Sequence, residues 1–373
     1  MESFRIHISQ NKIAGLKNRI KNTRWIEESA PATWITDTDV KYLKELSDYW
    51  LNAYDWKKQE SFLNSFKQYT TKIDSLKIHF LYEKGTGTKH IPILLLHGWA
   101  SCYTKYLKLV EMFKKENQDV DLIVPSHPAF AFSETPATAI NSGKVASIMH
   151  NLMTKVLGYD RYYVHGGDFG SFVGEKMAMD YPEAVKGLHL SDIPYYHLYG
   201  YNENLSQEEE NFINRINEWS MQDGAYAGIQ GSKPKTLSCA LNDSPVGLAA
   251  WLLQLFNDFS DKSKPIETKY NRDELLTNIS IYWFTETIYS SMRIYTEDTH
   301  GFGEPVIRKT SVPTGFCFYP FDISGIPPKA FANRFFTNIV SWTEQKSGGH
   351  FGAMENPFSL YLDLVDFMKT TSD

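Results

Sequence analysis

A glycine-rich segment joins a predicted strand directly to a predicted helix, and this junction limits the folds that are open to the chain. An apolar run over residues 162–164 precedes Gly166-Gly167-Asp168-Phe169-Gly170, and a helical run over 171–179 follows it. Such a sharp turn strains the backbone of its central residue, so small residues are required two positions before and after it. The flanking glycines meet that requirement. The pattern therefore predicts Asp168 at the tip of a turn between a strand and a helix.

Other short apolar runs alternate with helical patterns in the same way. They lie at 91–96, 122–124, 188–190, 315–319 and 339–342. Strands separated by helices of this length favour a mostly parallel sheet with helices on both faces. The alternating segment 76–82, which the turn at 85–87 closes, is predicted to begin the sheet. The fold class is therefore α/β.

Two stretches carry helical patterns without strands. Before the sheet, apolar residues recur at helical spacing over 11–22 and 40–54. After residue 195, helices are predicted over 206–219, 245–256 and 273–295, with Ser206 and Ser244 as N-caps. We therefore predict a helical N-terminal segment over 1–70, a core over 71–195 and 310–373, and an inserted helical cap over 196–309.

The charge balance argues against a nucleic-acid partner. The 38 Lys and Arg residues face 44 Asp and Glu residues, for a net charge of −6, and no basic stripe could follow a phosphate backbone.

Cysteine usage and the apolar runs indicate a cytoplasmic protein. Cys102, Cys239 and Cys317 are odd in number and far apart, so they are expected to be reduced thiols and not metal ligands. The longest apolar run, 91–96, is far shorter than the roughly 20 residues of a membrane helix. The first ten residues lack a secretory signal. We therefore expect no membrane anchor.

Asp168 decides which chemistry the turn can support. A carboxylate is a poor nucleophile toward acyl carbon and suits displacement at an sp³ carbon, so the target is a strained or activated alkyl centre. Epoxides and alkyl halides both offer one. The N–H groups at the start of the following helix favour the carboxylate and the charge that develops on its ester. Taken alone, the motif also fits a plain glycine-rich turn with a capping Asp.

An acid and a histidine follow Asp168 in the order that a hydrolytic triad on such a sheet requires. Asp322 comes just after the predicted strand 315–319, and His350 lies in a glycine-flanked loop after 339–342. We expect Asp322 to orient one imidazole nitrogen while the other deprotonates water. Asp192, which also follows a strand, is a second candidate for the acid.

His97-Gly98-Trp99 follows the predicted strand 91–96, where a loop commonly contributes to an oxyanion hole. The backbone N–H groups of Trp99 and Phe169 are predicted to converge on one oxygen. A tight turn with a buried Trp is the alternative reading of this motif.

With these positions placed, the chain resembles the microsomal-type epoxide hydrolases, which are α/β-hydrolases with a helical segment before the core. The resemblance spans residues 4–368. The matching stretches are FRIHIS at Phe4, HGW at His97, GGDFG at Gly166, ALNDSPVGLAAW at Ala240, LLTN at Leu275, RIYTE at Arg293, VPTGFCFYPFD at Val312 and GGHF at Gly348.

The resemblance implies that two cap tyrosines bind the epoxide oxygen, and the matching positions are Tyr226 and Tyr295. A phenol can donate one hydrogen bond to the ring oxygen and protonate it as the ring opens. Four positions depart from the family: Ala100, Phe169, His127 and Ala129. Ala100 stands where Pro is usual, and a cis peptide before a non-proline residue costs about 2.5–4 kcal/mol, which disfavours a cis bond there. Phe169 replaces a Trp.

The expected activity is hydrolysis of an apolar epoxide by water to a vicinal diol, through an ester on Asp168 and without metal or cofactor. A haloalkane dehalogenase is one alternative, but it needs side-chain N–H donors for the halide, and Phe169 offers none. A ligand-binding protein without turnover is another, although it has no need of nucleophile, acid and base. The sequence leaves open the physiological epoxide, a detoxifying or biosynthetic role, and the oligomeric state, a homodimer included.

Overall fold

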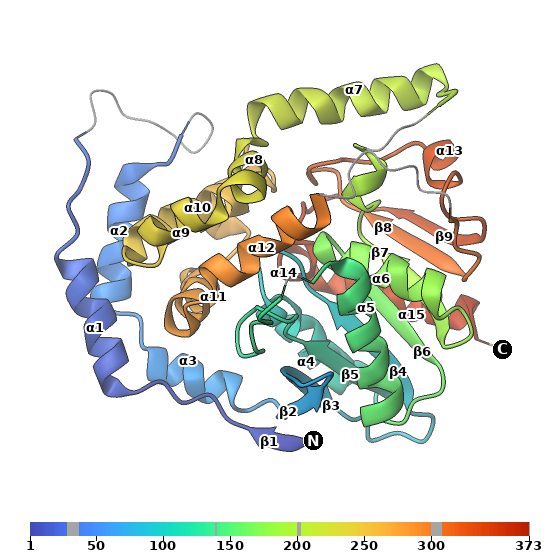
Figure 1. Cartoon of the computed structure of the whole chain (residues 1–373), viewed down its shortest axis with the longest axis horizontal. Coiled ribbons are helices and arrows are strands. Elements are labelled where there is room, and N and C mark those ends of the chain that lie inside the picture. Colours follow the sequence, from blue (N-terminus) through green and yellow to red (C-terminus); the bar gives the residue numbers. More distant parts are fainter. Residues whose placement is uncertain (28–36, 139, 200–202, 300–307, 373) are drawn as a thin grey trace.

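A single sheet organises the chain (Figure 1), and the computed structural model describes residues 1–27, 37–138, 140–199, 203–299 and 308–372. Within these residues the nine strands lie in the order β1-β2-β3-β5-β4-β6-β7-β8-β9. The strands are β1 (Glu2–Phe4), β2 (Gln68–Ile73), β3 (Leu76–Glu83), β4 (Ile91–Leu96), β5 (Val120–Pro125), β6 (Tyr162–Gly166), β7 (Val185–Leu190), β8 (Thr314–Phe318) and β9 (Ile339–Glu344). Neighbours from β5 through β9 are parallel, and the pairs β1–β2, β2–β3 and β3–β5 are antiparallel. The predicted α/β class is confirmed.

The sheet begins earlier than predicted, because β1 and β2 precede residue 76. Strand β2 lacks an apolar alternation, since its inward positions include the polar Gln68 and Thr70. Gln68 is satisfied by hydrogen bonds to the carbonyl of Leu63 and to the His79 ring. Tertiary contacts therefore make a buried strand from a sequence that looks exposed.

Both faces of the sheet are covered, which is why its central strands are continuously apolar. In β4, Ile93 and Leu95 belong to one apolar cluster, and Leu94 and Leu96 belong to the other. Helices α4 (Leu107–Glu116) and α15 (Pro357–Thr370) pack together in the first cluster, and α5 (Ser142–Asn151) and α6 (Phe169–Asp180) pack together in the second.

The cap helices lie between β7 and β8 in the chain. They are α7 (Gln207–Gln222), α8 (Ala225–Ser232), α9 (Pro234–Leu241), α10 (Pro245–Asp258), α11 (Arg272–Thr285) and α12 (Ile288–Thr299). Ser206 and Ser244 cap α7 and α10 as predicted. The single helix predicted over 273–295 is wrong: the chain breaks at Glu286, which is left-handed with φ 57°. Helix ends of this kind are usually marked by Gly or Asn, and here neither residue signals the break.

The N-terminal helices α1 (Gln10–Lys21), α2 (Val40–Asn52) and α3 (Trp56–Leu63) lie beside the cap (Figure 1). The Trp50 indole donates a hydrogen bond to Ser280 Oγ at 3.2 Å, and the Tyr54 hydroxyl lies 3.0 Å from Thr277 Oγ1. The remaining short helices are η1 (Tyr103–Tyr106), η2 (Leu152–Val156), η3 (Tyr195–His197), η4 (Ile266–Thr268), α13 (Lys329–Ala332) and α14 (Gly352–Glu355). In the described ranges, no helix has the length and apolar character needed to cross a membrane.

Candidate active site

Asp168 lies at the turn between β6 and α6 with φ 57° and ψ −131°. Such a conformation costs a non-glycine residue about 1–3 kcal/mol. A Cβ on Gly166 would overlap the carbonyl oxygen of Gly170, and a Cβ on Gly170 would overlap that of Leu96. Both positions therefore require glycine, as the sequence pattern predicts.

The Asp168 carboxylate is oriented by the loop after β4. The Trp99 N–H donates to Asp168 Oδ1 at 2.8 Å. The Trp99–Ala100 peptide bond is cis, contrary to the expectation from Ala100. The other predicted backbone donor, Phe169, makes no hydrogen bond to this carboxylate among the described contacts. One oxygen, Oδ1, is thus held by the backbone, while Oδ2 faces His350.

His350 and Asp322 come from the loops after β9 and β8 and meet beside Asp168. His350 Nδ1 lies 2.9 Å from Asp322 Oδ1, and His350 Nε2 lies 3.4 Å from Asp168 Oδ2. All three side chains are buried. The imidazole therefore lies between two carboxylates, one at each ring nitrogen.

The two carboxylates control the protonation of the imidazole. Burial by itself lowers the pKa of His350, but the interactions of its two ring nitrogens with the negatively charged Asp322 and Asp168 outweigh burial and raise that pKa to about 10. His350 is therefore an imidazolium at neutral pH as long as both carboxylates are charged.

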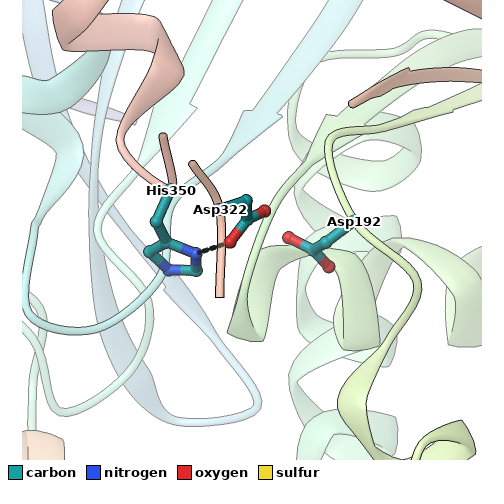
Figure 2. A group of neighbouring side chains, drawn as sticks. All are labelled: Asp192, Asp322 and His350. Atoms are coloured by element: carbon teal, nitrogen blue, oxygen red, sulfur yellow. Dashed lines mark hydrogen bonds and ion pairs between the residues drawn. The ribbon is translucent and has the colours of Figure 1, made fainter. Parts of the chain in front are cut away.

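Asp192, the other candidate for the acid, is not joined to the imidazole by a dashed line in Figure 2, whereas Asp322 is. Asp192 Oδ2 accepts the Asp168 N–H at 2.6 Å, and its Oδ1 lies 2.5 Å from Ser171 Oγ. Asp192, Asp322 and His350 have potential ligand atoms within 4.8 Å of one another. Each of these three side chains makes a hydrogen bond to another protein group. Of the two acids, Asp322 is the one hydrogen-bonded to His350.

A cavity of about 590 Å³ opens above Asp168, and Tyr226 of α8 and Tyr295 of α12 lie in its wall. The two phenol rings have centroids 6.0 Å apart at 81°, and the Trp99 ring stacks on Tyr226 at 6.3 Å. Burial, reinforced by the charge of Asp168, raises the pKa of both phenols, so both hydroxyls remain protonated donors. Much of the remaining wall is apolar, as at Phe172 and Ile294.

Tyr195 also belongs to this site, and sequence reasoning missed it. Its hydroxyl lies 3.2 Å from His350 Nδ1, and its side chain lines the cavity. The helix η3 that carries it is anchored by Glu175, which binds both the Tyr196 hydroxyl and the His197 ring. The chain has 22 tyrosines, and the only signal in the sequence for Tyr195 is its position shortly after a predicted strand.

Two family profiles together span residues 1–259, and a curated relative matches nearly the whole chain. The profile described as "Epoxide hydrolase N terminus" matches residues 1–106, and that described as "alpha/beta hydrolase fold" matches residues 91–259. Epoxide hydrolase 1 of Sus scrofa is 33% identical over 98% of this chain and 88% of its own length.

Two solved structures have the same architecture. Aspergillus niger epoxide hydrolase superimposes with a TM-score of 0.86 at 28% identity, over 100% of this chain and 96% of its own. Juvenile hormone epoxide hydrolase from the silkworm Bombyx mori superimposes with a TM-score of 0.88 at 27% identity, over 99% and 94% of the respective chains.

Proposed function

We infer, from the premise that this chain belongs to the microsomal-type epoxide hydrolases, that it opens its epoxide through a covalent ester on Asp168. Hydrolysis of an epoxide by water is the activity of the family. The observation that carries the covalent route is the orientation of the Asp168 carboxylate. Trp99 holds Oδ1, whereas Oδ2 has no backbone donor among the described residues, and the cavity that Asp168 lines also has two protonated phenols in its wall.

In the first step, Asp168 Oδ2 attacks an epoxide carbon and the bond from that carbon to the ring oxygen breaks. The ring oxygen takes a proton from Tyr226 or Tyr295. Ester formation removes the negative charge of Asp168, which was one of the causes that raised the pKa of His350. The His350 proton can then return to the tyrosinate, which leaves a neutral imidazole as the base for the next step.

In the second step, His350 Nε2 takes a proton from water, and the resulting hydroxide attacks Asp168 Cγ. The charge that develops on Oδ1 is stabilised by the Trp99 N–H. The Cγ–Oδ2 bond breaks, and the departing alkoxide takes the proton from His350 to complete the diol. The regenerated acid on Asp168 then gives its proton back to His350. Asp322, hydrogen-bonded to Nδ1, stabilises the imidazolium each time it forms.

Trapping the ester tests this route. His350→Gln removes the base, so incubation with styrene oxide should leave an adduct of the whole epoxide on the peptide that contains Asp168. Intact mass followed by peptide mapping would detect it. The control is the double variant His350→Gln with Asp168→Ala, which should show no adduct. An unmodified Asp168 peptide with a panel of epoxides would contradict the covalent route, and an adduct from a bromoalkane alone would indicate dehalogenation.

We further propose that the substrate is an apolar epoxide and that the enzyme acts in the cytoplasm without a nucleic-acid partner. The apolar part of the cavity wall supports an apolar epoxide. The three free cysteines support a cytoplasmic location, and the net charge of −6 argues against a nucleic-acid partner. Size-exclusion chromatography with light scattering would test whether the enzyme is a homodimer.

A further inference from the structure

Ser171 has one hydroxyl proton but two short oxygen contacts. Its Oγ lies 2.6 Å from the carbonyl oxygen of Asp168 and 2.5 Å from Asp192 Oδ1. Each contact has the length of a hydrogen bond and needs a proton between its oxygens. A carbonyl oxygen can only accept, so the hydroxyl proton belongs to the contact with Asp168. The proton in the other contact must then come from Asp192.

We propose that Asp192 is a carboxylic acid in the working enzyme and that its proton positions the Asp168 backbone for attack. Asp192 Oδ1–H donates to Ser171 Oγ, and Ser171 Oγ–H donates to the carbonyl of Asp168. The N–H of Asp168 donates in turn to Asp192 Oδ2, which closes a ring of three hydrogen bonds. The ring holds the N–H and the C=O of a residue whose φ is positive. Asp192 is thus a positioning residue.

The surrounding charges favour the neutral acid. Asp192 is 1% exposed, and the ionisable groups around it are Asp168 at the turn, Asp322 after β8 and His350 after β9, together with Lys105 and Tyr106 of η1 and Tyr195 of η3. The charge of His350 opposes this form, but His350 is engaged by Asp322 and Asp168. Burial and then the negative charge of Asp322 raise the pKa of Asp192 to about 7.

Loss of this proton at higher pH breaks the ring at one contact. Ser171 can then donate either to Asp192 or to the carbonyl of Asp168, and the two oxygens left without a proton repel each other. The expected consequence is slower attack by Asp168 on the epoxide. This kinetic consequence rests on the proposed function, whereas the protonation of Asp192 does not.

Infrared difference spectroscopy of the substrate-free enzyme tests the proton itself. Wild type minus Asp192→Asn should contain a carboxylic-acid carbonyl band at pH 6 that disappears by pH 9, since the protonated fraction falls about tenfold per pH unit above the pKa. A pH 6 difference with carboxylate bands alone would overturn the inference. If Asp192→Asn does not fold, Ser171→Ala should shift the acid band of the otherwise wild-type enzyme, and an unshifted band would be equally decisive against it.

The kinetic arm uses the shape of the pH profile. In Asp192→Asn, an amide N–H can replace the acid O–H and cannot be lost at pH 9. The ratio of the ester-formation rate at pH 9 to that at pH 6 should therefore exceed the wild-type ratio by about tenfold or more. Asp258→Asn, which alters a raised-pKa aspartate of α10 outside the site, should keep the wild-type ratio. Equal ratios in wild type and Asp192→Asn would refute the positioning role.

The two proposals can fail separately. An acid band from Asp192, together with no adduct on Asp168 in His350→Gln, would support the neutral Asp192 and contradict only its proposed effect on the rate of ester formation. An adduct on Asp168 without an acid band would support the covalent route and rule out the neutral acid.

Discussion

His350 lies between Asp322 at Nδ1 and Asp168 at Nε2, and its pKa reports the charge on both. Asp168→Asn removes one of the charges that hold this pKa at about 10, so the pKa should fall. Titration of the imidazole resonances by NMR would measure it. Asp322→Asn should lower the pKa of His350 more than Asp168→Asn does, because Asp322 contributes more to the raised pKa. An unchanged pKa in Asp168→Asn would contradict the view that ester formation releases the base.

Tyr226 and Tyr295 should both contribute to opening of the ring. Tyr226→Phe and Tyr295→Phe should each slow ester formation by about 10- to 100-fold, since each loses one donor to the developing alkoxide. The double variant should be slower than either. Rapid-quench single-turnover measurements would show the effect, with Tyr82→Phe as the control, whose phenol bonds Tyr159 outside the cavity. Wild-type rates in both single variants would exclude the assignment.

Helix α2 is held against the cap helix α11 by a buried side chain, Trp50, which is 2% exposed and hydrogen-bonded to Ser280. Trp50→Ala should lower the free energy of unfolding by about 3–5 kcal/mol, through lost burial and the cavity left behind. Denaturant unfolding would measure this loss. Trp25→Ala, at a Trp that is 36% exposed, should change stability by less than about 1 kcal/mol. If Trp50→Ala lowered the free energy of unfolding by as little as Trp25→Ala, the contact between α2 and the cap would contribute little to stability.

The break between α11 and α12 depends on the left-handed backbone of Glu286. Glycine adopts this conformation without a Cβ clash, so Glu286→Gly should raise the free energy of unfolding by about 0.5–1 kcal/mol. Glu286→Gln is the matched control, because it keeps the Cβ and removes only the charge near Lys12, an exposed pair with 3.9 Å between charged atoms. Similar stability of the two variants would show that the backbone is not strained there.

The whole protein should lose stability as the pH rises from neutral toward 10. His350 has a pKa of about 10 in the folded state and an ordinary value of 6.5. Its contribution to stability is therefore complete below pH 6.5 and is lost as the pH passes through 10. One proton accounts for at most about 1.4 kcal/mol per pH unit. Denaturation from pH 7 to 9 should give a flatter profile for His350→Gln, and parallel profiles would assign the slope to other groups.

Local sequence patterns were sufficient to predict the fold class, the central strands and the turn at Asp168. The glycine-flanked turn at Asp168, the apolar runs of the central strands and the caps at Ser206 and Ser244 each reflect a constraint that acts within a few residues. A Cβ on Gly166 would overlap the turn itself, and a Cβ on Gly170 would overlap the end of the neighbouring strand β4. Any sheet of this kind places a turn and a neighbouring strand there. These features, with the α/β class, were therefore predictable.

Predictions were wrong, or left an alternative open, where distant groups decided the outcome. Strand β2 is buried with polar inward residues because Leu63 and His79 satisfy Gln68. The break at Glu286 has no glycine to mark it. Asp192 and Asp322 both follow strands, and only the packed loops show that Asp322 binds His350 while Asp192 binds the turn.

Sequence alone therefore determined which residues are candidates for the reacting groups and in what order they occur, because the spacing of strand, turn and helix specifies where each lies along the chain. The protonation states of these groups depended on the tertiary structure. The raised pKa values of His350 and Asp192, and the two contacts that Ser171 makes with one hydroxyl proton, arise from charges and oxygens brought together in a buried volume by four separate loops. Coulombic and hydrogen-bond interactions at these distances have no counterpart in linear spacing.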